Sequence, residues 1–151
     1  QAEAMVVQAT QLLALGRKDE GRRAVERAVE IDPTFATAWV LLSDRRRVAG
    51  DLAGAEEALT HALPGQNTET DADALVMRGL IAVARKDTTR AIEHLLAAQG
   101  FRPRNRNAYL FAALYLFDRQ DPAGARASIE RGLEAIPGDP KLQEILNAMP
   151  R

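Results

Sequence analysis

Apolar residues recur along this chain at the spacing of an amphipathic helix. Near the C-terminus, Leu142, Ile145, Leu146 and Met149 stand at i, i+3, i+4 and i+7. This spacing puts all four on one stripe of a helix over about 140–149. Similar stretches predict eight further helices, over about 2–15, 20–31, 34–48, 52–63, 70–85, 88–100, 104–119 and 122–135.

Turn and capping residues divide these stretches. Gly50 and Asp51 separate two of the predicted helices, and Asp121 and Asp139 each stand directly before a proline. An aspartate at the N-cap with proline at the first helical position is a common start for a helix. The richest run of turn residues covers 64–71 and predicts the longest connection.

The pattern repeats with a period of 34 residues. Gly16 and Gly50 are 34 residues apart, as are Pro103 and Pro137. Each period contains a helix, a short turn and a second helix, which predicts four helical hairpins followed by a last single helix. The hairpins cover about 2–34, 35–69, 70–105 and 106–139.

Small residues recur at one place in the second helix of each hairpin. Ala55, Ala91 and Ala125 occupy it in the later hairpins, and Gly21 occupies it in the first. A side chain of one carbon or none lets two helix backbones approach closely. Because no hairpin can bury its apolar face alone, the repeats are expected to gain stability by stacking on one another.

The repeat resembles that of the tetratricopeptide family, which has a bulky residue at its fourth position, small residues at the eighth, twentieth and twenty-seventh, and proline at the thirty-second. The fourth repeat has Tyr109, Ala113, Ala125, Gly132 and Pro137 at these positions. The resemblance implies an all-α fold, an alpha-alpha superhelix of antiparallel hairpins, with residues 1–151 as one domain and the last helix as a solvating cap. The other repeats have Met5, Ala9, Gly21, Ala28 and Pro33; Trp39, Ser43, Ala55 and Ala62, with Asn67 replacing the proline; and Leu75, Gly79, Ala91, Ala98 and Pro103. Arg46 and Arg78 depart from the pattern, because large apolar residues are usual there.

The resemblance also implies a ligand groove along the first helices of the repeats, at positions two, five, nine and twelve. Family members that clamp a C-terminal carboxylate have Lys and Asn where this chain has Val6 and Thr10, so that clamp is not expected. An apolar groove suits an amphipathic helix or an extended apolar segment of a partner. The alternative is that a neighbouring hairpin or a flanking segment covers part of it. The predicted partner-binding residues are Val40, Asp44, Arg47, Asp73, Val76, Leu80, Val83, Asn107, Leu110, Leu114 and Phe117.

Composition narrows the classes of function. The formal net charge of -1 argues against nucleic-acid binding, which usually needs a basic excess. The absence of cysteine excludes disulfides and thiolate metal sites and is compatible with bacterial cytoplasm or periplasm. No apolar run approaches the roughly 20 residues of a membrane-spanning helix. The excess of arginine over lysine favours a bacterial source, and a start at Gln1 suggests a segment of a longer protein.

Residues suited to catalysis are few. His61 and His94 have no second histidine at metal-site spacing, and Glu57 four residues before His61 indicates an exposed helix pair. Ser43 occupies a packing position, and the dispersed glycines form no phosphate loop. We therefore expect no catalytic, cofactor-binding or metal-binding residues and no cofactor.

Two arginine clusters are candidates for an anion contact. Residues 45–47 form one, in which Arg47 is the best candidate, and Arg102, Arg104 and Arg106 form the other. A solvated surface with charge at a helix C-terminus is the favoured interpretation of the clusters.

The leading hypothesis is a protein-interaction module that acts as a scaffold or chaperone in a bacterial assembly. Two alternatives stay open: an accessory domain of a larger enzyme or of an envelope or secretion complex, and a self-assembling homo-oligomer. An independent enzyme has the least support.

Overall fold

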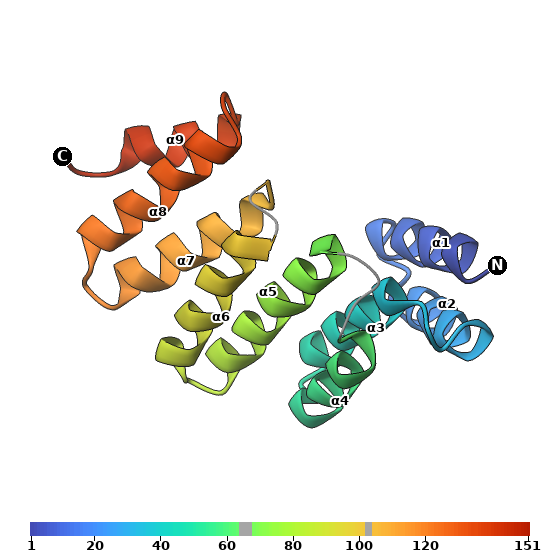
Figure 1. The fold of residues 1–151 in the computed structure, drawn as a ribbon. Helices are drawn as coiled ribbons and strands as arrows, with labels where there is room; N and C mark the ends of the chain where they lie inside the picture. The colour runs from blue at the N-terminus through green and yellow to red at the C-terminus, as the bar shows by residue number, and fades with distance from the viewer. Residues whose placement is uncertain (64–67, 102–103) are drawn as a thin grey trace. The chain divides into compact units, whose positions relative to one another are not determined.

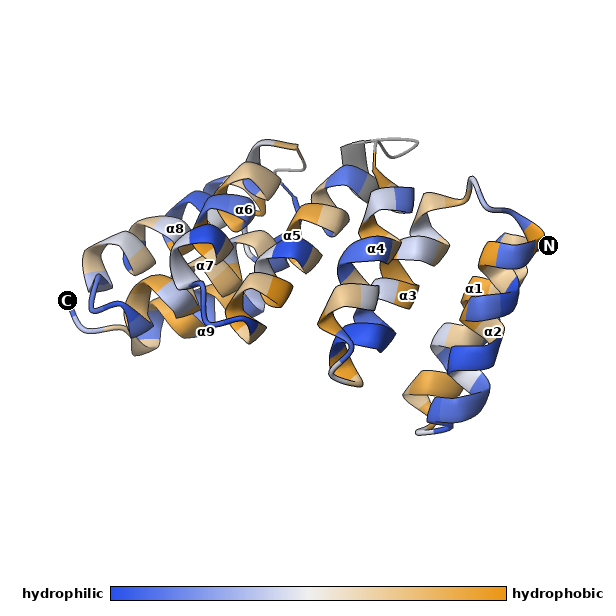
Figure 2. Ribbon diagram, turned by 90° about the horizontal axis from the view of Figure 1, so that it is seen from below, coloured by the Kyte–Doolittle hydropathy of each residue, from blue (hydrophilic) through white to orange (hydrophobic). Residues whose placement is uncertain are grey.

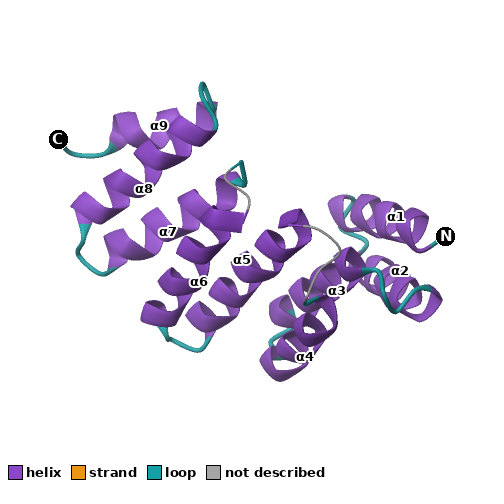
Figure 3. Cartoon of the chain, viewed as in Figure 1, coloured by secondary structure: helices purple, strands orange, loops and turns teal. Residues whose placement is uncertain are grey.

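The computed structural model describes residues 1–63, 68–101 and 104–151, with only the backbone described for 68–70. Within these ranges the chain is helical and has no strand (Figures 1 and 3). None of the described helices is both long and apolar enough to cross a bilayer. The helices are α1 (Ala2–Ala14), α2 (Lys18–Ile31), α3 (Ala36–Val48), α4 (Leu52–Ala62), α5 (Thr68–Ala84), α6 (Thr88–Phe101), α7 (Arg106–Asp118), α8 (Pro122–Ala135) and α9 (Pro140–Ala148).

The chain forms two compact units, Gln1–Met77 and Arg78–Arg151, and α5 contributes residues to both. In the first unit α1 pairs with α2 and α3 pairs with α4, while α2 also packs on α3. In the second unit α6 packs on α7, α7 on α8 and α8 on α9. Hydrophilic and hydrophobic residues alternate along each helix (Figure 2), as expected of helices that each bury one face.

Four helix-to-helix turns share one geometry. A residue with positive φ follows the first helix of each hairpin: Gly16 at 76°, Gly50 at 86°, and Lys86 and Gln120 both at 62°. The next residue then donates its amide to a carbonyl five residues back, as Asp51 does to Arg46 at 2.9 Å. The same bond closes the turns at Arg17, Asp87 and Asp121. A residue in the left-handed region thus ends the first helix of each hairpin and lets its last carbonyls accept hydrogen bonds that the helix itself does not supply. The recurrence of this ending confirms the repeat in the backbone.

Several helix boundaries differ from the sequence-based prediction by two residues. The carboxylate of Asp32 accepts hydrogen bonds from the amide of Thr34 at 2.9 Å and from its hydroxyl at 2.6 Å. This local turn delays α3 until Ala36. Asn105 caps α7, which therefore begins at Arg106.

The predicted turn over 64–71 is wrong in its second half, because α5 already begins at Thr68. Its first half, with Asn67, lies outside the described residues, as does Pro103. The helix α2 also begins earlier than predicted, at Lys18. The predicted caps at Asp121 and Asp139 are confirmed, since each carboxylate accepts a backbone amide at the start of its helix.

Small residues lie where helices approach most closely. Ala55, Ala91 and Ala125 are fully buried. A Cβ atom added to Gly21 would stand 2.6 Å from Cγ of Leu13, which is closer than real Cβ contacts allow. The small side chains therefore let the helix backbones approach, as the sequence predicts.

Two buried serines join the helices of their hairpins. The hydroxyl of Ser43 donates to the carbonyl oxygen of Ala55 at 2.8 Å, and that of Ser128 donates to the carbonyl oxygen of Tyr109 at 3.0 Å. Each bond links one helix to the backbone of its partner, so each buried hydroxyl is satisfied.

Arg46 and Trp39 show how the second hairpin accommodates its unusual residues. Arg46 donates from Nη1 to the carbonyl oxygen of Gly54 at 2.9 Å and lies 3.6 Å from a carboxylate oxygen of Glu57, so its charge is partnered where an apolar side chain is usual. Trp39 is half-buried, stacks on His61 with ring centroids 4.2 Å apart, and donates from Nε1 to the carbonyl oxygen of Pro33 at 2.8 Å. The contact described for His61 is thus an aromatic stack.

Candidate partner-binding pocket

An apolar pocket of about 430 Å³ lies between α7 and α9 in the second unit. Its volume falls within the roughly 300–1,000 Å³ of typical ligand pockets. The α7 wall consists of Leu110, Phe111, Ala113, Leu114 and Phe117, and the remaining lining residues are Lys141, Ile145, Ala148, Met149 and Pro150.

Helical periodicity builds both walls. On α7, Leu110, Leu114 and Phe117 are four and three residues apart and share one face. Ile145 on α9 and Met149, the residue that follows α9, are four residues apart and line the pocket with them. Leu142 on the same stripe is fully buried and joins the core of this unit with Tyr109, Ala113, Ala125 and Ile129, against which Ile145 and Met149 also pack.

Two large apolar side chains of the α7 wall remain open to solvent. Leu114 is 49% exposed and Phe117 is 51% exposed. Exposed apolar side chains that gather at a cavity, rather than being scattered singly, are typical of interaction sites.

A buried carboxylate anchors α9 beside α7. Asp139 is the N-cap of α9 and accepts the amides of Lys141 at 3.1 Å and Leu142 at 3.0 Å. Its Oδ2 also accepts a hydrogen bond from Nε of Arg106, the first residue of α7, at 2.8 Å. The Leu142 amide, followed by the Arg106 guanidinium, holds the pKa of Asp139 below its usual value, so the carboxylate stays ionised.

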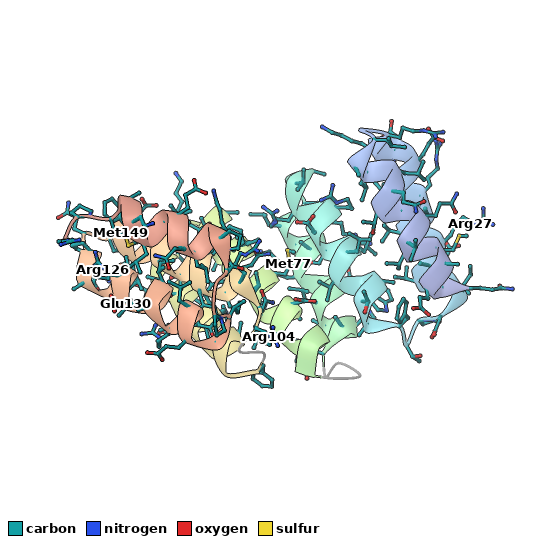
Figure 4. All side chains as sticks on the ribbon, turned by 90° about the horizontal axis from the view of Figure 1, so that it is seen from above. Arg27, Met77, Arg104, Arg126, Glu130 and Met149 are labelled. Atoms are coloured by element: carbon teal, nitrogen blue, oxygen red, sulfur yellow. The ribbon has the colours of Figure 1, made fainter. Side chains whose placement is uncertain are left out.

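Just beyond the end of α9, the chain contacts α8. Arg126 donates to the carbonyl oxygen of Pro150 at 3.4 Å and to a carboxylate oxygen of Glu130 at 3.4 Å. Figure 4 labels Arg126 and Glu130 together with Met149, the residue before Pro150. Since Pro150 lines the pocket, Arg126 supports the pocket wall from outside.

Three of the predicted binding residues line the pocket: Leu110, Leu114 and Phe117. Asn107 is exposed at the start of α7 and does not line it. Leu80 and Val83 on α5 are half-buried and are also outside the lining.

The predicted residues of the first unit lie in a different environment. Val40 and Asp73 are half-buried, and Val76 is only 6% exposed, which leaves it little surface for a ligand. Asp44 accepts a hydrogen bond from Arg47 at 2.7 Å. Burial acts to raise the pKa of Asp44, but hydrogen bonds from Arg47 and Arg45 outweigh it and lower the pKa.

Several arginines of the two clusters are paired with neighbouring groups of the chain. In the first cluster, Arg45 and Arg47 share the carboxylate of Asp44, and all three arginines of 45–47 are half-buried. In the second cluster, Arg104 is exposed but Arg106 pairs with the buried Asp139. Arg102 lies outside the described residues. The four paired arginines have carboxylates or a backbone carbonyl as partners, and residues 45–47 lie in the last turn of α3, where positive charge is favourable.

The histidines lie on separate helices and in different surroundings. His61 on α4 is exposed and stacked on Trp39. His94 on α6 is half-buried, and burial, together with the charges of Arg78 and Arg90, lowers its pKa. Across the described part of the chain, no three side chains of the His, Cys, Asp or Glu type gather to hold a metal ion.

Comparison with known proteins identifies the repeat. Residues 6–72 and 76–140 match the profile of the tetratricopeptide repeat. The chain belongs to the tetratricopeptide repeat (TPR) family. The TPR fold is in general a scaffold for protein–protein interaction, and its members are typically non-catalytic.

Individual TPR proteins resemble the chain to different extents. The TPR repeat-containing protein PA0015 of Pseudomonas aeruginosa is 37% identical over 62 residues, which are 41% of this chain and 59% of that protein. The solved structure of Pseudomonas aeruginosa pilF matches 98% of this chain and 67% of its own with a TM-score of 0.78 at 21% identity. YrrB, described as a TPR protein with an unusual peptide-binding site, matches 99% of this chain and 76% of its own with a TM-score of 0.61 at 18% identity. These matches confirm the predicted fold class, the alpha-alpha superhelix of TPR proteins.

The α9 wall is the part of the pocket that the sequence analysis missed. The stripe of Leu142, Ile145, Leu146 and Met149 predicted a cap that packs on the previous hairpin, and Leu142 does so. The signal was nevertheless present in the TPR register. Lys141 follows Asn107 by 34 residues and Ala148 follows Leu114 by 34, so the rule for groove positions also selects two pocket residues on the last helix.

Proposed function

We propose that this chain is a protein-binding module that holds an apolar or amphipathic segment of a partner in the pocket between α7 and α9. The observation that carries the proposal is the pairing of an apolar pocket with the half-exposed Leu114 and Phe117 on the ligand-facing positions of a TPR helix. The peptide-binding site named for YrrB supports the same kind of ligand.

The size of the pocket indicates how a partner would use it. A volume of about 430 Å³ accommodates a few side chains but not a whole helix. The partner would therefore lie across the opening and insert apolar anchors, as amphipathic helices do in grooves. Each Å² of apolar surface removed from water contributes about 25 cal/mol, and part of that is offset by the cost of association. A short segment should thus bind moderately and reversibly.

At the level of the cell, we propose a scaffold or chaperone role in a bacterial assembly. The relatives from Pseudomonas aeruginosa support a bacterial setting. An accessory role in a larger enzyme or envelope complex, or self-assembly, is the second candidate.

Selection from a library of random peptides displayed on phage tests the pocket directly, because the library itself supplies the ligands. We expect selected peptides to bind the parent chain and to lose affinity for Leu114→Glu and Phe117→Glu, since a buried carboxylate opposes an apolar anchor. Leu96→Glu is the matched control, because Leu96 on α6 is a similarly exposed leucine, at 42%, outside the pocket lining. Peptides that bind both pocket variants as tightly as this control would contradict the proposal.

A further inference from the structure

Lys141 is the charged member of an otherwise apolar pocket lining. It lies in the first turn of α9, whereas Phe117 and Met149 lie near the opposite ends of the two pocket helices. A ligand in the pocket therefore meets a cation toward the start of the helices and apolar side chains toward their ends.

The ammonium of Lys141 is held only weakly by its own chain. Nζ lies 3.6 Å from Oε2 of Glu144, and the two side chains are 50% and 70% exposed. An exposed ion pair three residues apart on a helix contributes little stability. Lys141 can therefore leave Glu144 and pair with a carboxylate of a ligand at little cost in free energy. Arg106 and Asp139, at the same end of the two helices, are already paired with each other.

An apolar ligand would change the surroundings of this cation. As the pocket fills, water is displaced from its rim, and a charge that loses water without gaining a partner opposes binding. A carboxylate on the ligand removes that penalty. The start of α9 adds a partial positive charge of the same sign, although its Lys141 and Leu142 amides are already bonded to Asp139.

We propose that the partner segment is amphipathic and acidic: its apolar side chains fill the pocket beside Leu114 and Phe117, and a Glu or Asp side chain pairs with Lys141. This inference rests on the proposed function and adds the charge and the orientation of the ligand. It also assigns Lys141 as a residue that selects among apolar segments by their charge.

The test uses the peptides selected on the parent chain, resynthesised with a fluorophore, and measures their Kd. We expect an acidic residue at a fixed distance from the apolar anchors. Lys141→Glu and Lys141→Met should each raise Kd, by about 5- to 30-fold for the charge reversal. Lys18→Glu, the same reversal at an exposed lysine of α2, should leave Kd unchanged.

Two further measurements separate pairing from a general effect of charge. A peptide with Lys in place of its acidic residue should bind Lys141→Glu better than it binds the parent chain. Glu144→Gln should tighten the acidic peptide a few-fold, because it removes the competing carboxylate, and should not affect a neutral peptide.

The outcomes distinguish the two proposals. Peptides that require Leu114 and Phe117 but carry no acid, or that bind folded Lys141→Glu and Lys141→Met as tightly as the parent, would overturn the acidic-partner inference and leave the pocket intact. The proposed function would instead be contradicted if the selected peptides bound Leu114→Glu and Phe117→Glu as tightly as the parent chain, or if the library yielded no binder.

Discussion

Arg106 donates a hydrogen bond from Nε to Oδ2 of Asp139 over 2.8 Å, although 33 residues separate them in the chain. The bond joins the first residue of α7 to the N-cap of α9. The Asp139 side chain is only 5% exposed, so the guanidinium neutralises a charge that has little contact with water. This pair links the two helices that form the pocket.

Removal of the Arg106 guanidinium should loosen α9. In Arg106→Met the buried carboxylate keeps its two amide donors but loses its cation, which is costly because the charge is already shielded from water. Hydrogen exchange measured by mass spectrometry should show faster exchange across α9, with less change in α1 to α4. Arg104→Met is the control, because Arg104 is exposed two residues earlier. Equal protection of α9 in both variants would show that the pair does not hold the helix.

The same carboxylate should make the stability of the second unit depend on acid pH. In the unfolded chain Asp139 should titrate near its ordinary pKa of about 3.9. The folded pKa is lower, so the unfolded state takes up a proton first as the pH falls. The contribution of Asp139 is therefore fully present above about pH 4 and is lost as the pH falls through the folded pKa. Urea unfolding at a series of pH values from 6 downward should show a smaller acid-induced loss in Asp139→Asn than in the parent. An equal loss in both would assign the effect to other carboxylates, such as Asp44 and Asp32, whose pKa values are also lowered.

Gly132 should tolerate no side chain. A Cβ atom there would stand 2.9 Å from Cδ1 of Leu142 and 2.9 Å from Cγ of Tyr109, both in the core of the second unit. Gly132→Ala should therefore destabilise this unit by roughly 1–3 kcal/mol in urea unfolding and displace α9. Gly100→Ala is the matched control, since nothing lies within 4 Å of a Cβ at that position. It should be neutral or stabilising by up to about 1 kcal/mol. A neutral Gly132→Ala would mean that α9 is not packed closely on this glycine.

Trp39 should matter less than a fully buried tryptophan. A full Trp→Ala truncation in a core costs roughly 3–5 kcal/mol, but Trp39 is half-buried and rests on the exposed ring of His61. We expect Trp39→Ala to lower the free energy of unfolding by less than about 3 kcal/mol, as measured by chemical unfolding. His61→Ala should lower it by a smaller amount. Because Trp39 is the one tryptophan of the sequence, its fluorescence in His61→Ala reports directly on the stack. Unchanged emission in that variant would argue against the stack in solution.

The sequence predicts the hairpins well because their causes are local. The caps at Asp121 and Asp139 act within one turn of helix, and the small residues in register act within one hairpin. The sequence places the start of α5 too late, because residues 68–71 are polar and resemble the turn residues before them although they belong to the helix. Polar residues at the start of a helix and in a loop look alike in a sequence.

The sequence predicts only three of the ten residues that line the pocket, for a different physical reason. Val76 and Leu114 both occupy groove positions of their repeats, and periodicity treats them alike. Their exposed fractions are 6% and 49%, because burial depends on neighbours that a single helix does not specify. Charge has the same limit: the sequence shows Arg45 and Arg47 but not the carboxylate of Asp44 that both share.

Different residues of this chain hold the helices together and form its exposed apolar surface. Buried alanines and glycines such as Ala125 and Gly132 hold the backbones together, while Leu114 and Phe117 project from the same scaffold into solvent. Under the proposed function, mutation of the projecting residues would therefore change which partner is recognised without changing how the chain folds. Related genes could diverge toward new partners through a few positions on α7 and α9, and the alanine and glycine positions would be the slowest to change.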